Sequence, residues 1–339
     1  MPKTDKTIEA GQRWPLPRVT QKADGTPRKV GVEFELQGVT VEQLANIVST
    51  TLGGTSQPVN DAEYRVDVPA HGEYRVEIDS ALLKDNARLL EDQDADTSEL
   101  QEAAINALGN ASSLVVPCEV VSPPIPMNEL AEPMDALVRA VREAGGQGTQ
   151  QSPLYAFGVH LNIEPPEMSA RQVSSYIKAF VCLYDWIVQA GDVDLMRRLM
   201  PYIRKFPASY ESQVTDPGYK PDWTALIDDY LAANPTRNRA LDMLPMFAEV
   251  DEPRVRNIVD DDLIKARPAF HYRLANCCID DPSWSIADPW SRWLQIEHLA
   301  ADAERLTECC AAFAADRQRL LGSLDNKWSE EVQRWLTTS

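Results

Sequence analysis

The feature that most constrains the fold is a strict alternation of apolar and polar side chains in several short segments. In residues 29–37 every second side chain is apolar, and the residues between are glycine or polar. Because successive side chains of a strand point to opposite faces, this pattern is typical of a half-buried β-strand. Similar patterns over 63–68, 73–79, 157–164 and 269–275 predict an antiparallel sheet with one apolar face and one polar face.

Helical signals separate these strands. Thr40 is suited to cap a helix that ends at Gly53-Gly54, and Ser169 to cap an apolar helix that ends near Gly191. Further helices are predicted over 128–143 and 289–321, a buried strand over 113–121, and a loop with one short helix over 90–110. The chain is therefore expected to be α+β, with helices packed on the apolar face of the sheet.

The expected organisation is one large domain with short extensions. Residues 1–28 are polar and proline-containing, and we interpret them as an irregular arm. Residues 29–321 would form the domain, and residues 322–339 a C-terminal tail. Frequent prolines divide residues 192–265 into short helical pieces, which indicates a mainly helical insertion.

Charge and hydropathy exclude several classes of protein. The net charge of -19 disfavours binding to nucleic acid or to an anionic membrane. The N-terminal residues lack an apolar signal segment, and no run of about 18 apolar residues occurs, so we expect a cytoplasmic protein. The six cysteines show no zinc-binding spacing and are expected to be buried free thiols.

The polar faces of the predicted strands carry the side chains that could take part in catalysis or ligand binding. Residues two apart share a face, so each strand presents a functional pair. These pairs are Glu33 and Glu35, Glu77 and Asp79, His160 and Asn162, and His271 and Arg273, with Glu119 on a fifth strand. A plain antiparallel sheet with a solvated polar face would give the same alternation.

Clustered carboxylates favour a divalent cation, because they otherwise raise one another's pKa. Mg²⁺ prefers oxygen ligands and often retains phosphate oxygens in its shell, so acids near an arginine indicate a metal-bound nucleotide. The chain has no Walker loop, no GxGxxG and no HExxH motif. Carboxylates and arginines are therefore the candidate phosphate-handling groups.

Five short motifs resemble those of a known family. They are Gly31-Val32-Glu33-Phe34-Glu35, Glu77-Ile78-Asp79-Ser80, Glu119-Val120-Val121-Ser122-Pro123, Gly158-Val159-His160-Leu161-Asn162 and Phe270-His271-Tyr272-Arg273. In this order they resemble the putative amidoligase branch of the carboxylate-amine ligases, which include glutamine synthetase and glutamate-cysteine ligase. The resemblance implies a glutamine synthetase-like fold, in which the sheet lines a funnel-like active site.

The resemblance also implies a role for each residue. The metal ligands would be Glu33, Glu35, Glu77, Asp79 and Glu119. Asn162, His271 and Arg273 would contact the nucleotide, and His160, Arg273 and Arg267 would act at the transferring phosphate.

The last motif departs from the family pattern, because His271 replaces an expected metal-binding acid. Imidazole suits Mn²⁺ better than Mg²⁺, so Mn²⁺ is an alternative cofactor. The implied reaction uses ATP to convert a carboxylate of an amino acid or peptide into an acyl phosphate, which an amine then attacks. Two alternatives stay open: an inactive homologue that binds nucleotide or peptide, and a metal-dependent hydrolase.

Overall fold

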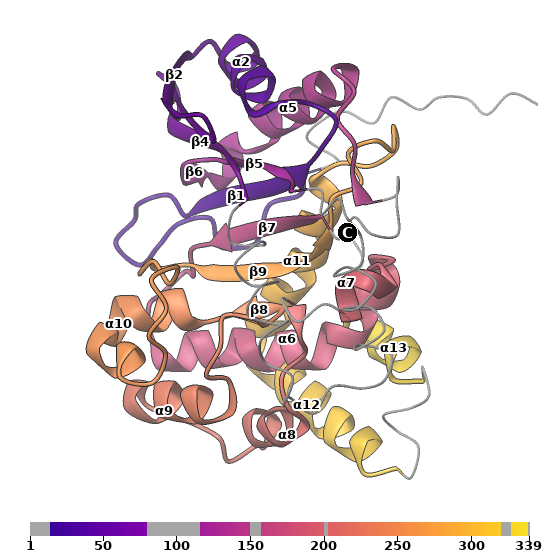
Figure 1. The fold of residues 1–339 in the computed structure, drawn as a ribbon. Helices are drawn as coiled ribbons and strands as arrows, with labels where there is room; N and C mark the ends of the chain where they lie inside the picture. Colours follow the sequence, from indigo (N-terminus) through magenta and orange to yellow (C-terminus); the bar gives the residue numbers. More distant parts are fainter. Residues whose placement is uncertain (1–13, 80–115, 150–156, 200–202, 320–326, 338–339) are drawn as a thin grey trace, which may run out of the picture.

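The computed structural model describes residues 14–79, 116–149, 157–199, 203–319 and 327–337 (Figure 1). The predicted loop and helix at 90–110, most of the N-terminal arm and part of the C-terminal tail lie outside these ranges. The division of the chain into arm, domain, insertion and tail stays a prediction.

The sheet runs through most of the described chain in the order β2-β3-β4-β5-β1-β7-β9-β8, and β6 pairs with β1. Every pairing between these strands is antiparallel. The strands are β1 (Lys29–Leu36), β2 (Thr55–Asn60), β3 (Glu63–Val68), β4 (Gly72–Ile78), β5 (Cys118–Val121), β6 (Ile125–Pro126), β7 (Gly158–Ile163), β8 (Leu241–Asp242) and β9 (Phe270–Asn276). The α+β class and the antiparallel sheet are confirmed. The sheet is open in the described residues, so the funnel stays a prediction.

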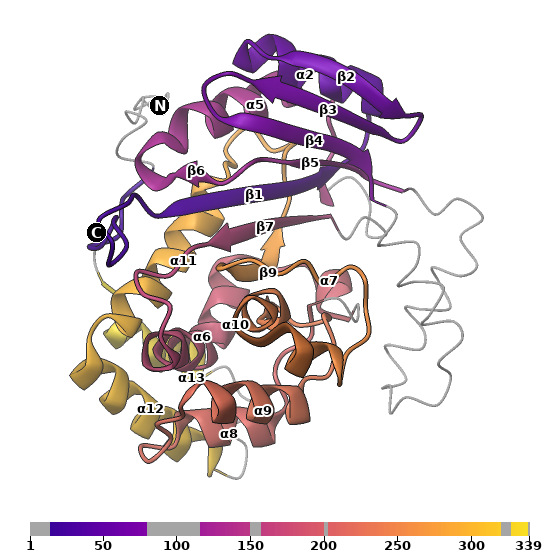
Figure 2. The ribbon, with the colours of Figure 1, turned by 90° about the vertical axis from the view of Figure 1, so that its left-hand side faces the viewer.

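The helices are α2 (Val41–Leu52), α5 (Ala131–Glu143), α6 (Ala170–Ala190), α7 (Leu195–Leu199), α8 (Ala208–Thr215), α9 (Trp223–Ala233), α10 (Leu244–Arg256), α11 (Ala287–Ala300), α12 (Ala303–Arg317) and α13 (Lys327–Glu331). Short 3-10 turns precede α5 and follow α13. In both ribbon views α2 and α5 lie beside the β2 end of the sheet, whereas α8, α9 and α12 gather beyond β9 (Figures 1 and 2).

The predicted apolar face forms the core. Register places Val32 opposite Leu161, and Leu161 opposite Tyr272, so these buried side chains share one face. Helices α6 and α11 cover this face through aromatic contacts: the Tyr176 ring stacks on Phe270 with centroids 4.7 Å apart. Burial of such large rings supplies much of the driving force for packing helices on the sheet.

Local signals set the helix ends as expected. The Thr40 hydroxyl accepts from the backbone N–H of Gln43, whose side chain returns the bond to the Thr40 backbone, which is a complete capping box. Ser169 caps α6 by accepting from Gln172. Gly53 ends α2 with φ 70°, a conformation that costs glycine little.

Two element predictions were wrong in detail. The single helix predicted over 289–321 is instead two helices, because Asp302 leaves the helical conformation and caps α12 by accepting from the N–H of Arg305. In the described part of segment 113–121, the strand begins only at Cys118, after Pro117. The predicted buried thiols are confirmed, since all six cysteines are free and buried.

Segment 192–265 is mainly helical, as predicted, but it also contributes to the sheet. Between α9 and α10 it forms the short strand β8, which pairs with β9 so that Leu241 faces Tyr272 and Asp242 faces His271. The segment therefore supplies the last strand of the path and one acidic side chain to the polar face.

Candidate functional site

Strand register brings the predicted site residues onto one face of the sheet. Glu35 lies opposite Glu119, which in turn lies opposite Glu77. On the other side of β1, Glu33 lies opposite His160. One residue pair further along β7, Asn162 lies opposite His271. Because directly paired residues point to the same side of a sheet, the predicted pairs form one continuous polar face.

This polar face is buried over its central strands. Glu35, Glu119, His160, His271 and Arg273 are 5, 7, 7, 7 and 8% exposed. The expectation of half-buried strands was therefore wrong for β1, β7 and β9, and the alternative of a solvated polar face does not describe this region. Burying so many ionisable groups is costly unless they are paired with one another or with a ligand.

Glu33 lies at the centre of the hydrogen-bonded network. Its Oε1 accepts from the Asn162 amide at 2.7 Å, and its Oε2 lies 3.1 Å from Nδ1 of His160 and 3.8 Å from Nε2 of His271. Burial alone would raise the pKa of Glu33, but the contacts with both imidazoles outweigh burial and hold the pKa well below its ordinary value. Glu33 is therefore a carboxylate in this setting.

The pKa values of Glu35 and Glu119 are shifted in the opposite direction from that of Glu33. Glu35 Oε2 accepts from the Gly158 N–H at 2.7 Å, yet burial and then the nearby charge of Asp79 raise the Glu35 pKa to about 7. Burial, followed by the charge of Glu33, raises the pKa of Glu119 well above its ordinary value. A bound cation would relieve the repulsion between these two carboxyl groups and the carboxylate of Glu33.

His160 connects these two halves. Its Nδ1 faces Glu33, and its Nε2 lies 3.6 Å from Glu35 Oε1. Burial lowers the pKa of His160 to about 3, so the imidazole is neutral. Since a carboxylate can only accept, Nδ1 carries the proton and the Nε2 lone pair faces Glu35.

The arginines flank this cluster. Arg273 donates from one terminal nitrogen to the Arg237 carbonyl at 2.9 Å, while its buried Nε has no hydrogen-bond partner among the described residues. Arg267 donates to Asn162 Oδ1 at 2.9 Å and so fixes the amide that contacts Glu33. Both predicted arginines thus lie at the polar face.

Glu77 and Asp79 lie further from the centre. Glu77 forms an ion pair with Arg75 at 2.8 Å and is more exposed than Glu119. Burial raises the pKa of Glu77, although Arg75 opposes the rise. Asp79 follows the last residue of β4 and acts on Glu35 and Glu119 through its charge. Neither belongs to the compact ligand groups described next.

Two groups of side chains have the spacing of metal ligands. Glu33, His160 and His271 form one, and Glu35, Glu119 and His160 the other, with ligand atoms within 4.8 Å of one another in each. The buried His271 Nε2 has no hydrogen-bond partner among the described residues. Carboxylates together with two imidazoles, one of which has this unpartnered nitrogen, fit a divalent cation. Which residues bind metal stays a prediction.

Sequence reasoning missed two residues near this cluster. Asp242, on β8, lies 3.4 Å from Nδ1 of His271. Arg197, on α7, is buried, donates to the Arg273 carbonyl at 2.8 Å and acts on Glu35 through its charge. A two-residue strand and a short helix give no periodic signal, so neither could be assigned to the face.

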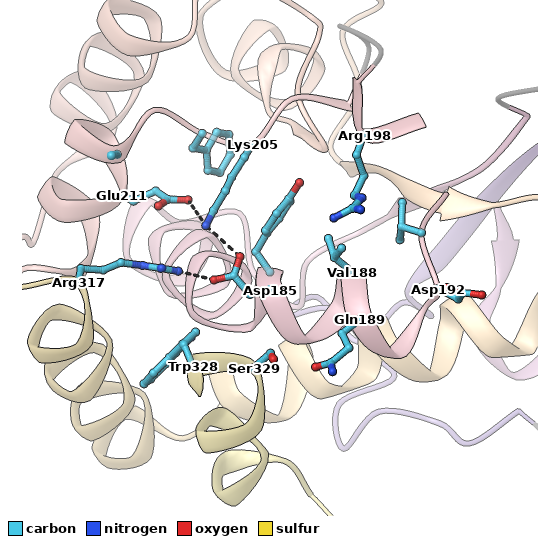
Figure 3. A pocket seen from close by; sticks show the side chains of 14 residues that line it. Asp185, Val188, Gln189, Asp192, Arg198, Lys205, Glu211, Arg317, Trp328 and Ser329 are labelled. Atoms are coloured by element: carbon cyan, nitrogen blue, oxygen red, sulfur yellow. Dashed lines mark hydrogen bonds and ion pairs between the residues drawn. The ribbon is translucent and has the colours of Figure 1, made fainter. Parts of the chain in front are cut away.

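A cavity of about 680 Å³ lies away from this face, between α6, α8 and α13 (Figure 3). Four of its charged lining residues pair with one another: Lys205 lies 3.1 Å from Asp185 and 3.4 Å from Glu211, and Arg317 points toward Asp185. None of its lining residues belongs to the polar face of the sheet.

Comparisons with known proteins gave one match. A family model described as putative amidoligase enzyme matches residues 26–295, which is more than half of the 339-residue chain. The match includes all the strands of the sheet. Searches of curated proteins and of solved structures found no match. Among the described helices, none combines the length and apolar character needed to cross a membrane.

Proposed function

The chain belongs to the putative amidoligase family, and we propose that it is an ATP-dependent ligase that joins a carboxylate to an amine through an acyl phosphate. The observation that carries this proposal is the convergence of Glu33, Glu35, Glu119 and two imidazoles on one buried face beside Arg273. A site rich in carboxylates, with an arginine and without a nucleophile activated by a base, suits phosphoryl transfer between substrates.

The metal would be held by Glu33, Glu35, Glu119 and His160, with Glu77 and Asp79 at the outer edge. A bound Mg²⁺ or Mn²⁺ would neutralise charge on the phosphate oxygens of ATP. The raised pKa of Glu35 and of Glu119 supports this assignment, because a cation would replace the protons that otherwise relieve the repulsion.

The other polar residues would position the nucleotide and the transferred phosphate. The unsatisfied Nε of Arg273 is a donor that a phosphate oxygen could meet, and a guanidinium stays charged throughout. Asn162, held by Arg267, would orient the nucleotide, and His271 would contact the metal that binds its phosphates. Neutral His160 would sit beside the transferring phosphate without adding charge.

The burial of this face supports an activated intermediate. An acyl phosphate hydrolyses if water reaches it, so a ligase must keep water away until the amine attacks. Amino acids or peptides are the proposed substrates, on the basis of the family resemblance. The amine would displace phosphate from the acyl carbon, which forms the amide and releases inorganic phosphate.

The test is ADP release in the presence of Mg²⁺ or Mn²⁺, screened over pairs of amino acids and small peptides. Hydroxylamine in place of the amine should trap the acyl phosphate as a hydroxamate. Glu33→Gln should abolish both signals and metal-dependent nucleotide binding, whereas Glu42→Gln, an exposed site on α2, should not.

The same assay separates the alternatives. Amide hydrolysis that ignores ATP would identify a metal-dependent hydrolase instead. Nucleotide binding without turnover over the whole panel would identify an inactive homologue. Either result would contradict the proposed ligase.

A further inference from the structure

The carboxyl group of Asp242 has two distinct contacts, both within the core. Asp242 is 1% exposed and lies directly opposite His271 in the pairing of β8 with β9. Its Oδ1 accepts from the N–H of Leu244 at 3.0 Å, at the start of α10. Its Oδ2 lies 3.4 Å from Nδ1 of His271.

The first contact explains a structural role and the second does not. A turn into α10 needs one acceptor for the Leu244 N–H, and Oδ1 supplies it. Among the described residues, Oδ2 has one hydrogen-bonding contact, with the imidazole of His271. Because a carboxylate can only accept, this contact directs an Nδ1–H of His271 toward Asp242.

The contact with Asp242 also affects the opposite nitrogen of the His271 ring. The other ring nitrogen of His271, Nε2, faces Glu33, whose Oε2 lies 3.8 Å away. Nε2 is buried and without a hydrogen-bond partner among the described residues. The rings of His160 and His271 meet edge to face, with centroids 5.4 Å apart, so both imidazoles border the same small space beside Glu33.

We infer that Asp242 is a positioning residue that holds His271 as a metal ligand through Nε2, and that this nitrogen-containing position prefers Mn²⁺ or a similar borderline cation to Mg²⁺. The inference rests on the proposed cation site. A carboxylate behind a ligating histidine fixes the tautomer and ring orientation and increases the basicity of the ligand. An imidazole nitrogen among the ligands favours cations that accept nitrogen, such as Mn²⁺, over Mg²⁺.

Asp242→Asn tests this with little change in shape. An amide has one acceptor oxygen, which cannot serve both Leu244 and His271. If the oxygen stays on Leu244, the amide NH₂ faces Nδ1 and forces the proton onto Nε2, which then cannot bind a metal. Mn²⁺ affinity, measured by loss of the free-ion electron paramagnetic resonance signal, should fall about 10- to 100-fold.

A spectroscopic readout separates positioning from general damage. Pulsed electron paramagnetic resonance of bound Mn²⁺ should show nitrogen coupling from His271 in the wild type, identified by its loss in His271→Ala, and the same coupling should be lost in Asp242→Asn. Asp316→Asn, at another buried acid on α12, should change neither affinity nor coupling. In the His271→Ala background, Asp242→Asn should have no further effect on Mn²⁺ affinity, because Asp242 acts on the metal through His271.

The inference is overturned by unchanged Mn²⁺ affinity and nitrogen coupling in folded Asp242→Asn, or by wild-type protein whose bound Mn²⁺ shows no coupling to His271. A full additional loss in the His271→Ala background would also overturn it. These measurements involve no ATP. A wild type that binds Mn²⁺ as expected but never turns over ATP would contradict the proposed ligase and leave the role of Asp242 intact.

Discussion

The buried ion pair between Arg28 and Glu297 ties the start of β1 to α11, and its loss should be costly. Arg28 is 0% and Glu297 4% exposed, and two parallel hydrogen bonds of 2.6 and 3.0 Å join them. Glu297 also accepts from the Tyr176 hydroxyl and from the indole N–H of Trp293. Every acceptor position of this carboxylate is therefore used inside the core.

Glu297→Gln keeps the shape of the side chain and removes its charge. The guanidinium of Arg28 stays charged, so the variant contains a buried cation without a counter-charge. Breaking one side of such a pair costs about 3–5 kcal/mol, because the remaining charge keeps its desolvation penalty. Urea unfolding followed by tryptophan fluorescence should show this loss, and Trp293 reports directly on the site.

Two control variants define the mechanism. Glu331→Gln breaks an exposed pair with Arg334 at the far end of the chain and should cost under about 1 kcal/mol. Arg28→Met combined with Glu297→Gln removes both charges and should lose no more than Glu297→Gln alone. The reasoning is refuted if Glu297→Gln costs as little as the exposed control, or if the two core substitutions add.

Two further predictions concern the candidate site and the cavity between α6, α8 and α13. Arg273→Lys should lower kcat about 100-fold, with a smaller change in KM, because an ammonium cannot reproduce the guanidinium contacts; activity kept near wild type would contradict it. Burial raises the pKa of Glu211 to about 7 from an ordinary 4.5, against the opposing charge of Lys205. The folded state thus binds more protons between these values, so stability falls as pH rises through this window. Glu211→Gln should flatten that decline in melting curves from pH 5 to 8, and an unchanged slope would count against the assignment.

The sheet and most of its polar residues could be predicted because alternation is a local property of the sequence. Glu33, Glu35, His160 and Asn162 are fixed on one face by the period of the strand alone. The capping signals at Thr40 and Ser169 are equally local, and both helices begin where these signals predict. Such features need no knowledge of distant parts of the chain.

Burial of the polar face could not be predicted, because it depends on which segments lie over it. A glutamate at every second position has the same sequence pattern whether water or protein covers it. The same limit hid Arg197, whose place beside Glu35 depends on how α7 meets β9. The break between α11 and α12 is a different case: Asp302 carried a capping signal, but the apolar pattern continued across it.

His271 shows how such a long-range contact changes the interpretation of a residue. In the sequence it was a departure from the family pattern, an acid lost from the last motif. The structure places the carboxyl group of Asp242 one strand away, directly behind the imidazole. An acid on β9 would present oxygen to the cluster, whereas His271 backed by Asp242 presents nitrogen and keeps a carboxyl within 3.4 Å. If the proposed cation site exists, the substitution changes the type of donor atom offered to the cation without removing the acid from the region, so we expect a change of metal preference rather than a loss of the site.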